Sequence, residues 1–178
     1  MPEAVSVDPG TPSVRCSDDV AALIVELASD EGLSRKRARR CLIRVGERAV
    51  PALLEALVDE RPHLRIEAAE TLLYIASPSS APSLVEALDD HEFGVRWLAA
   101  EALISLKCDG LVPLLEGITR HSRSMWFRQA AHHVLHDHYC DALRDTLRPV
   151  LDALNRRGAE CTAPVAAGAV LEKIAARR

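Results

Sequence analysis

The sequence repeats itself with a period of 31 residues, and this self-similarity limits the chain to folds that stack one unit several times. Three similar segments place a proline near the start of a short apolar run. They are AVPALLEALVDE with Pro51, SAPSLVEALDD with Pro82 and LVPLLEGITRH with Pro113. Proline is tolerated in the first turn of a helix, where its missing N–H would have no intrahelical partner. Each segment is therefore predicted to begin a short helix at its proline.

A second helical segment precedes each of these helices. The copies are RIEAAETLLYIA at 65–76, RWLAAEALISL at 96–106 and the diverged FRQAAHHVLHDHY at 127–139. Small residues at matched positions, such as Ala69 and Ala100, let neighbouring helices approach closely. One hairpin of two helices cannot bury its apolar face alone, so consecutive hairpins are expected to stack into a solenoid.

Composition agrees with an all-α chain. Only 3% of the residues are aromatic although 48% are hydrophobic, which favours closely packed helices over sheets. The formal net charge of −4 excludes a global positive field of the kind that drives nonspecific binding to nucleic acid. No apolar run approaches the ~18 residues that span a bilayer, and no secretory signal is present, so we expect a cytoplasmic protein without a membrane contact.

The same patterns divide the chain into a leader and one repeat domain. The first sixteen residues hold three prolines and no helical period, and are expected to be flexible, with order from Ser17. The predicted units are a flexible leader at 1–16 and a solenoid at 17–178, with repeats at about 34–61, 62–92, 93–124 and 125–157 and a C-terminal capping helix at 160–178.

The repeat resembles the HEAT repeat family, in particular short bacterial repeats with VR-x-x-A-A-x-x-L followed by V-P-x-L-x-x-x-L. The resemblance covers residues 34 to about 155. It implies a right-handed α-α superhelix of about four helical hairpins with helical caps. It also implies a non-catalytic scaffold that binds a protein or peptide on its concave face, which the second helices of the hairpins line.

HEAT repeats commonly carry an aspartate six residues before the arginine, and the two side chains form a ladder between units. Two copies here have this spacing, namely Asp59 with Arg65 and Asp90 with Arg96. The third copy has Ser122 six residues before Arg128, and the first has Ser34 at the arginine position. We therefore expect the ladder to weaken in the first and third copies.

The predicted binding face follows from the second helices. If Leu54, Leu57, Leu84 and Leu88 point into the core, other side chains must point outward. Aligned copies give an acidic row of Glu55, Glu86, Glu116 and Asp152, with Asp59 and Asp90 nearby. Beside it runs a row of small residues, Ala56, Ala87, Gly117 and Ala153. An acidic row beside a smooth strip would accept a basic partner helix or peptide. The alternative is that these carboxylates form a solvated face.

A basic helix at 35–48 supports an alternative function in nucleic-acid binding. Its candidate contacts for an anion are Arg35, Lys36, Arg39, Arg40 and Arg44. The offset of 31 residues also predicts that Lys36 stacks beside Glu67, and Arg39 beside Glu70. We favour this paired, solvated face over a nucleic-acid site.

The third candidate is a group of histidines near the third copy. His132, His136 and Cys140 are spaced i, i+4 and i+8, so one helix face would carry all three, as a partial zinc site requires. Two histidines and one cysteine fall short of four ligands, and the register with earlier copies points to packing positions. No P-loop, GxSxG, GxGxxG or HExxH is present. We therefore expect no metal, no cofactor and no enzymatic activity, with metal-dependent activity at this cluster as the alternative.

Overall fold

The computed structural model describes residues 18–137 and 143–176, and within these ranges the chain is helical, without a strand. The predicted leader at 1–16 lies outside the described residues. The α-helices are α1 (Val20–Leu27), α2 (Gly32–Val45), α3 (Val50–Ala56), α4 (Pro62–Ile75), α5 (Ala81–Ala87), α6 (Phe93–Ser105), α7 (Cys108–His121), α8 (Met125–Asp137), α9 (Arg144–Leu154) and α10 (Ala159–Ala175). Two short 3-10 helices, η1 (Gly46–Ala49) and η2 (Pro78–Ser80), lead into α3 and α5.

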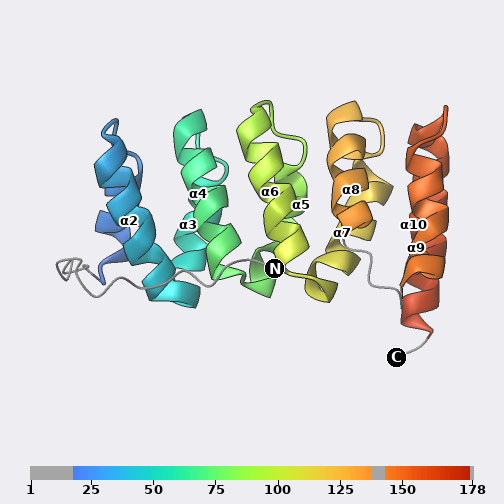
Figure 1. The fold of residues 1–178 in the computed structure, drawn as a ribbon, viewed down its shortest axis with the longest axis horizontal. Coiled ribbons are helices and arrows are strands. Elements are labelled where there is room, and N and C mark those ends of the chain that lie inside the picture. The colour runs from blue at the N-terminus through green and yellow to red at the C-terminus, as the bar shows by residue number, and fades with distance from the viewer. Residues whose placement is uncertain (1–17, 138–142, 177–178) are drawn as a thin grey trace.

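The helices stand side by side in two rows along the long axis of the molecule (Figure 1). One row runs α2, α4, α6 and α8, and each of these helices packs on the next. Behind it lie α1, α3, α5 and α7, of which α5 and α7 pack on each other. The core lies between the rows, where Leu53, Leu72, Leu84 and Leu103 are fully buried. The predicted all-α solenoid of stacked hairpins is confirmed.

The prolines mark helix starts in two of the three copies. Pro51 lies in the first turn of α3 and Pro82 in the first turn of α5, as predicted. Pro113 lies inside α7, which begins at Cys108, so the predicted start at Pro113 is wrong. Lys107 provides the break between α6 and α7, because its φ of 53° is left-handed and ends the preceding helix.

The C-terminal end departs from the expected order of helices. We expected α9 to be the second helix of the fourth hairpin, and α10 to begin a further unit. α9 packs against α8 as expected, but α10 packs against both α9 and α7, so α10 continues the second row. Ala159, Ala163 and Ala167 are buried on α10 at intervals of about one turn, and such small residues allow neighbouring helices to approach closely.

Candidate functional surfaces

An arginine near the start of each first-row helix binds the end of the preceding second helix or turn. The Nη1 of Arg65 donates to the carbonyl oxygens of Asp59 at 2.8 Å and Glu60 at 3.2 Å. Arg35, Arg96 and Arg128 make the same pair of bonds to the residues six and five positions before them. Carbonyl groups at helix ends lack intrahelical donors, and these arginines supply the missing hydrogen bonds at the junction between consecutive hairpins.

The predicted ladder between units is present at one step. Arg65 on α4 donates from Nε and Nη2 to the two carboxylate oxygens of Asp90, at 2.7 and 2.9 Å. The two side chains are only 13% and 14% exposed, and the bonds to Asp90 raise the pKa of Arg65. Asp59 instead accepts from Arg61 at 2.8 Å, which lowers the pKa of Asp59 to about 2. Asp59 therefore stabilises the turn in which it lies.

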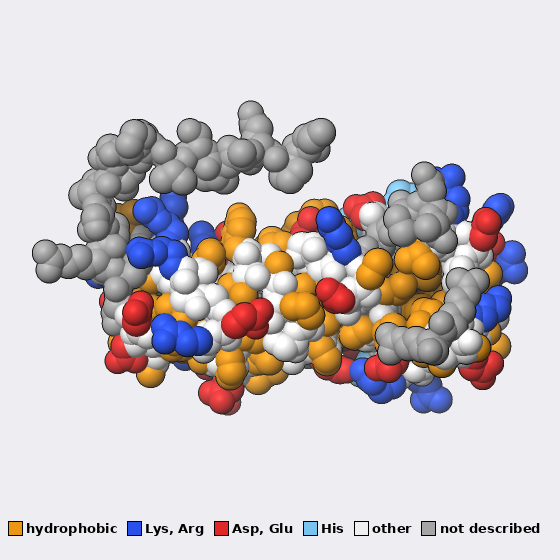
Figure 2. Space-filling model, turned by 90° about the horizontal axis from the view of Figure 1, so that it is seen from below, with side chains coloured by type: hydrophobic (Ala, Val, Ile, Leu, Met, Phe, Trp, Pro, Cys, Tyr) orange, Lys and Arg blue, Asp and Glu red, His pale blue; other side chains and the backbone are white. Residues whose placement is uncertain are grey.

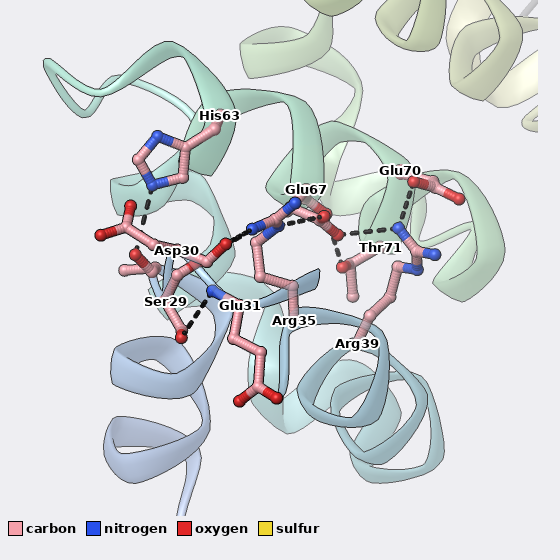
Figure 3. Close-up of polar contacts among 10 residues, drawn as sticks. Ser29, Asp30, Glu31, Arg35, Arg39, His63, Glu67, Glu70 and Thr71 are labelled. Atoms are coloured by element: carbon pink, nitrogen blue, oxygen red, sulfur yellow. Dashed lines mark hydrogen bonds and ion pairs between the residues drawn. The ribbon is translucent and has the colours of Figure 1, made fainter. Parts of the chain in front are cut away.

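The first copy has its arginine at position 35, so the predicted register, which placed Ser34 there, is wrong by one residue. Figure 3 shows Arg35 and Arg39 reaching from α2 to α4. Arg35 Nε lies 3.0 Å from Glu67, while Arg39 bonds Glu67 at 2.7 Å and also Glu70. The predicted pair of Arg39 with Glu70 is confirmed. The predicted pair of Lys36 with Glu67 is wrong, because Arg35 holds that place.

This pairing removes two of the predicted cationic residues from the candidate nucleic-acid surface on α2. Arg35 and Arg39 are half-buried and serve the contact between units. Lys36, Arg40 and Arg44 are exposed, and Lys36 and Arg40 form no ion pair with any residue in the described ranges. Figure 2 shows Lys and Arg side chains gathered at this end of the molecule, and others at the opposite end.

The predicted strip of small residues on the second helices is not a surface. Ala56 and Ala87 are 4% and 8% exposed, and Gly117 is buried. A Cβ built on Gly117 would lie 2.3 Å from a methyl group of Val85, so this position is small because α5 and α7 touch there. Leu57, Leu84 and Leu88 are buried as predicted, and Leu54 is half-buried. The buried arc of these helices is wider than assumed, because it also includes the small residues.

The acidic row is present in part. Glu55, Glu86 and Glu116 are exposed, and Glu86 bonds Arg120 at 3.1 Å and His121 at 2.9 Å on α7. Asp152 does not continue the row, because α9 packs against α8 and not against α7.

A hollow of about 380 Å³ opens between the ends of α3 and α5. Leu57 and Ala87 form an apolar floor, and Val58 is 79% exposed at its edge. The carboxylates that line it are Asp59, Glu60, Glu86 and Asp90. We call this hollow the α3–α5 groove. Three of its acidic residues, Asp59, Glu86 and Asp90, belong to the predicted binding set.

The histidine cluster forms contacts between helices. His132 Nε2 lies 2.8 Å from Asn155 Nδ2 on α9, and the ring of His136 stacks on that of His132 at 6.1 Å. Burial, followed by the charges of His136 and His133, lowers the pKa of His132. Cys140, the third predicted ligand, lies outside the described residues. Across residues 18–137 and 143–176, no three His, Cys, Asp or Glu side chains are grouped to hold a metal ion.

The family profile described as HEAT repeats matches residues 20–104 and 51–136, which together span about two thirds of the chain. The chain belongs to the HEAT repeat family. One similar solved structure is a chain in the complex of CpcE and CpcF of phycocyanin lyase from Nostoc sp. PCC7120. It is 24% identical, with a TM-score of 0.56 over 85% of this chain and 96% of that chain, which shows a shared fold. The comparison with curated proteins found no match.

This HEAT solenoid also carries an aromatic cluster that the sequence reasoning missed. The Arg96 guanidinium lies 4.8 Å from the centre of the Trp126 ring and 5.7 Å from that of Phe93. Ser122 stands where the ladder would need an aspartate, so Arg96 contacts aromatic rings at this step. Trp97 stacks on His133 at 5.0 Å. The sequence feature that could have revealed this cluster is the i, i+4 spacing of Phe93 and Trp97 in a chain with few aromatic residues.

No helix in the described part of this HEAT solenoid has the length and apolarity to span a membrane.

Proposed function

We propose that this chain is a non-catalytic scaffold that binds a protein or peptide in the α3–α5 groove. The observation that carries the proposal is the combination in one hollow of an apolar floor, formed by Leu57 and Ala87, with an acidic rim. Apolar contacts supply affinity in such a groove, and charged rims select the partner. The similar solved chain comes from a complex of two proteins, CpcE and CpcF, which supports a role in protein binding.

The charges of the groove favour a basic partner. Four carboxylates line it, and three of them, Asp59, Glu86 and Asp90, are bonded to Arg61, Arg120 and Arg65. Glu60 forms no ion pair with a residue in the described ranges and leaves the groove with a surplus of negative charge. Both hydrogen-bonding edges of Arg65 are already engaged, by Asp90 and by two backbone carbonyls. The surplus negative charge would attract lysine or arginine side chains, while Val58 would contact an apolar side chain beside them.

A photo-crosslinking amino acid at position 58 tests the proposal in cells. The matched control is position 165 on α10, because Val58 and Val165 are 79% and 73% exposed. We expect one discrete crosslinked protein from position 58 and none from position 165. Glu60→Lys should abolish the crosslink, whereas Glu172→Lys, the same charge change at an exposed site on α10, should preserve it.

Two results would contradict the proposal. The first is a crosslink from position 165 that equals the crosslink from position 58. The second is a crosslink from position 58 that survives Glu60→Lys. The helical circular dichroism signal of each variant must match that of the parent chain, so that a lost crosslink is not a lost fold.

A further inference from the structure

We propose that the chain carries a second, independent binding site at its C-terminal end, for a ligand that bears phosphate groups. The site lies where α8, α9 and the start of α10 meet, away from the α3–α5 groove. Its central residues are Arg148, Arg156, Arg157, His132 and Asn155.

The space for a ligand consists of two adjoining hollows of about 420 and 410 Å³. His132 and Asn155 line both hollows, and their side chains contact each other at 2.8 Å. Each hollow has the size of an ordinary small-molecule site, about 300–1,000 Å³. Together they offer room for a ligand with more than one charged group.

The lining of the two hollows is strongly basic although the whole chain has a net charge of −4. The cationic residues that line them are Arg128, Arg144, Arg148, Arg156 and Arg157, and the acidic residues are Asp152 and Glu160. A concentration of guanidinium groups around a concave surface raises the local concentration of anions. The arginine side chain fits phosphate with two parallel hydrogen bonds, and several guanidinium groups around one concave surface suit an anion that carries more than one negative charge.

Three of these arginines are available for a ligand. Arg148, Arg156 and Arg157 are exposed, and none forms an ion pair with a residue in the part of the chain that the structure describes. Arg35, Arg39 and Arg65 differ, because each of them bonds a carboxylate of the neighbouring unit. The solenoid thus uses some of its arginines for stacking and leaves this group at the C-terminal end uncommitted.

The turn between α9 and α10 adds to the positive character of the site. Gly158 adopts a left-handed φ of 80°, which ends one helix and starts the next within a few residues. This turn places the first turn of the 17-residue α10 beside Arg156 and Arg157. The N–H groups and the dipole of a helix start favour an anion, and here they reinforce the arginines.

Titration of the full chain with sodium tripolyphosphate, followed by calorimetry, tests the proposal. We expect saturable binding with one site, weakened as the salt concentration rises. Arg156→Gln with Arg157→Gln should weaken binding by about tenfold or more, and Arg148→Gln alone by a smaller factor. The matched control is Arg37→Gln with Arg40→Gln, two exposed residues on α2, which should change the affinity less than about twofold.

The result decides between the phosphate site and general charge attraction. Absence of saturable binding would overturn the proposal, and so would equal weakening by the α2 control pair. The single variant Arg148→Gln keeps the test valid if the double variant loses its helical signal. Glu60→Lys in the α3–α5 groove should leave tripolyphosphate binding intact, so failure of the scaffold proposal and failure of this one are distinguishable.

Two further arms identify the source of the phosphate. Vesicles that contain phosphatidylinositol phosphates, compared with pure phosphatidylcholine vesicles, test a lipid headgroup. Binding to the former that tripolyphosphate displaces supports the site and assigns it to a headgroup. Tripolyphosphate binding without vesicle binding assigns it to a soluble phosphate compound. Binding of a labelled single-stranded oligonucleotide without any binding of tripolyphosphate would refute the proposal, because the site would then recognise a nucleic acid.

Discussion

Replacing Gly117 by alanine tests whether this position is a packing contact or part of an open surface. Gly117 lies in α7 at its contact with α5 and α8. The added Cβ would lie 2.3 Å from Val85 Cγ1 and 3.0 Å from Phe127 Cζ, and both of these side chains are fully buried. Carbon atoms pack at about 3.5–4.0 Å, so α5 and α7 would have to move apart.

Two opposing terms set the size of the effect. Alanine in a helix interior is favoured over glycine by about 1 kcal/mol, which would stabilise the variant. Overpacking a buried contact costs about 1–3 kcal/mol. We expect the upper part of this range, because Val85 is branched at Cβ and cannot rotate away from the new methyl group. The net expected loss in the free energy of unfolding is about 1–2 kcal/mol.

Urea unfolding followed by circular dichroism measures this loss. Gly168→Ala in α10 is the matched control, because nothing lies within 4 Å of the added Cβ, and it should stabilise the chain by about 0.5–1 kcal/mol. In a Val85→Ala background, Gly117→Ala should become much less destabilising, since the opposing methyl group is gone. If Gly117→Ala behaves like Gly168→Ala, Gly117 is not at a packed contact and the reasoning fails.

Two further predictions concern charged groups. Asp90→Asn should lower the free energy of unfolding by about 1–2 kcal/mol in urea titrations, because the half-buried Arg65 loses its charged partner. The control is Glu60→Gln at an exposed rim position, which should change the free energy of unfolding by less than about 0.5 kcal/mol. The lowered pKa of His132 means that the folded chain binds its proton less readily than the unfolded chain, whose value is 6.5. The free energy of unfolding should therefore fall as the pH drops below 6.5 until His132 is protonated in the folded state as well. In His132→Gln, urea midpoints at pH 7.5 and 5.5 should differ less than in the parent chain; an unchanged difference would contradict this assignment.

The sequence by itself determined the helical hairpins and their stacking. Periods of 3.6 residues within a helix and 31 residues between copies report which positions are buried, and these local patterns recur in each unit. They placed Pro51 and Pro82 in first turns, and Leu72 and Leu103 in the core. The HEAT resemblance anticipated a ladder, and the structure realises it between Arg65 and Asp90.

Only the tertiary structure determined which side chains of each helix point toward its neighbours. One residue of register rotates a helix by about 100°, so a slip of one position exchanges inward and outward side chains. This is why Arg35, and not Ser34, continues the row of arginines. Gly117 is buried for another reason, because α5 and α7 pack on each other where an open strip was expected.

The tertiary structure alone also decided the C-terminal end. The comparison with earlier copies assigned α10 to the start of a further unit, whereas α10 packs along α7 and α9. The packing of helices determines the order, since α10 packs along α7 and α9, and α9 lies against α8. That order brings Arg148, Arg156 and Arg157 next to His132 on α8, and so creates a basic site from residues that the sequence keeps apart.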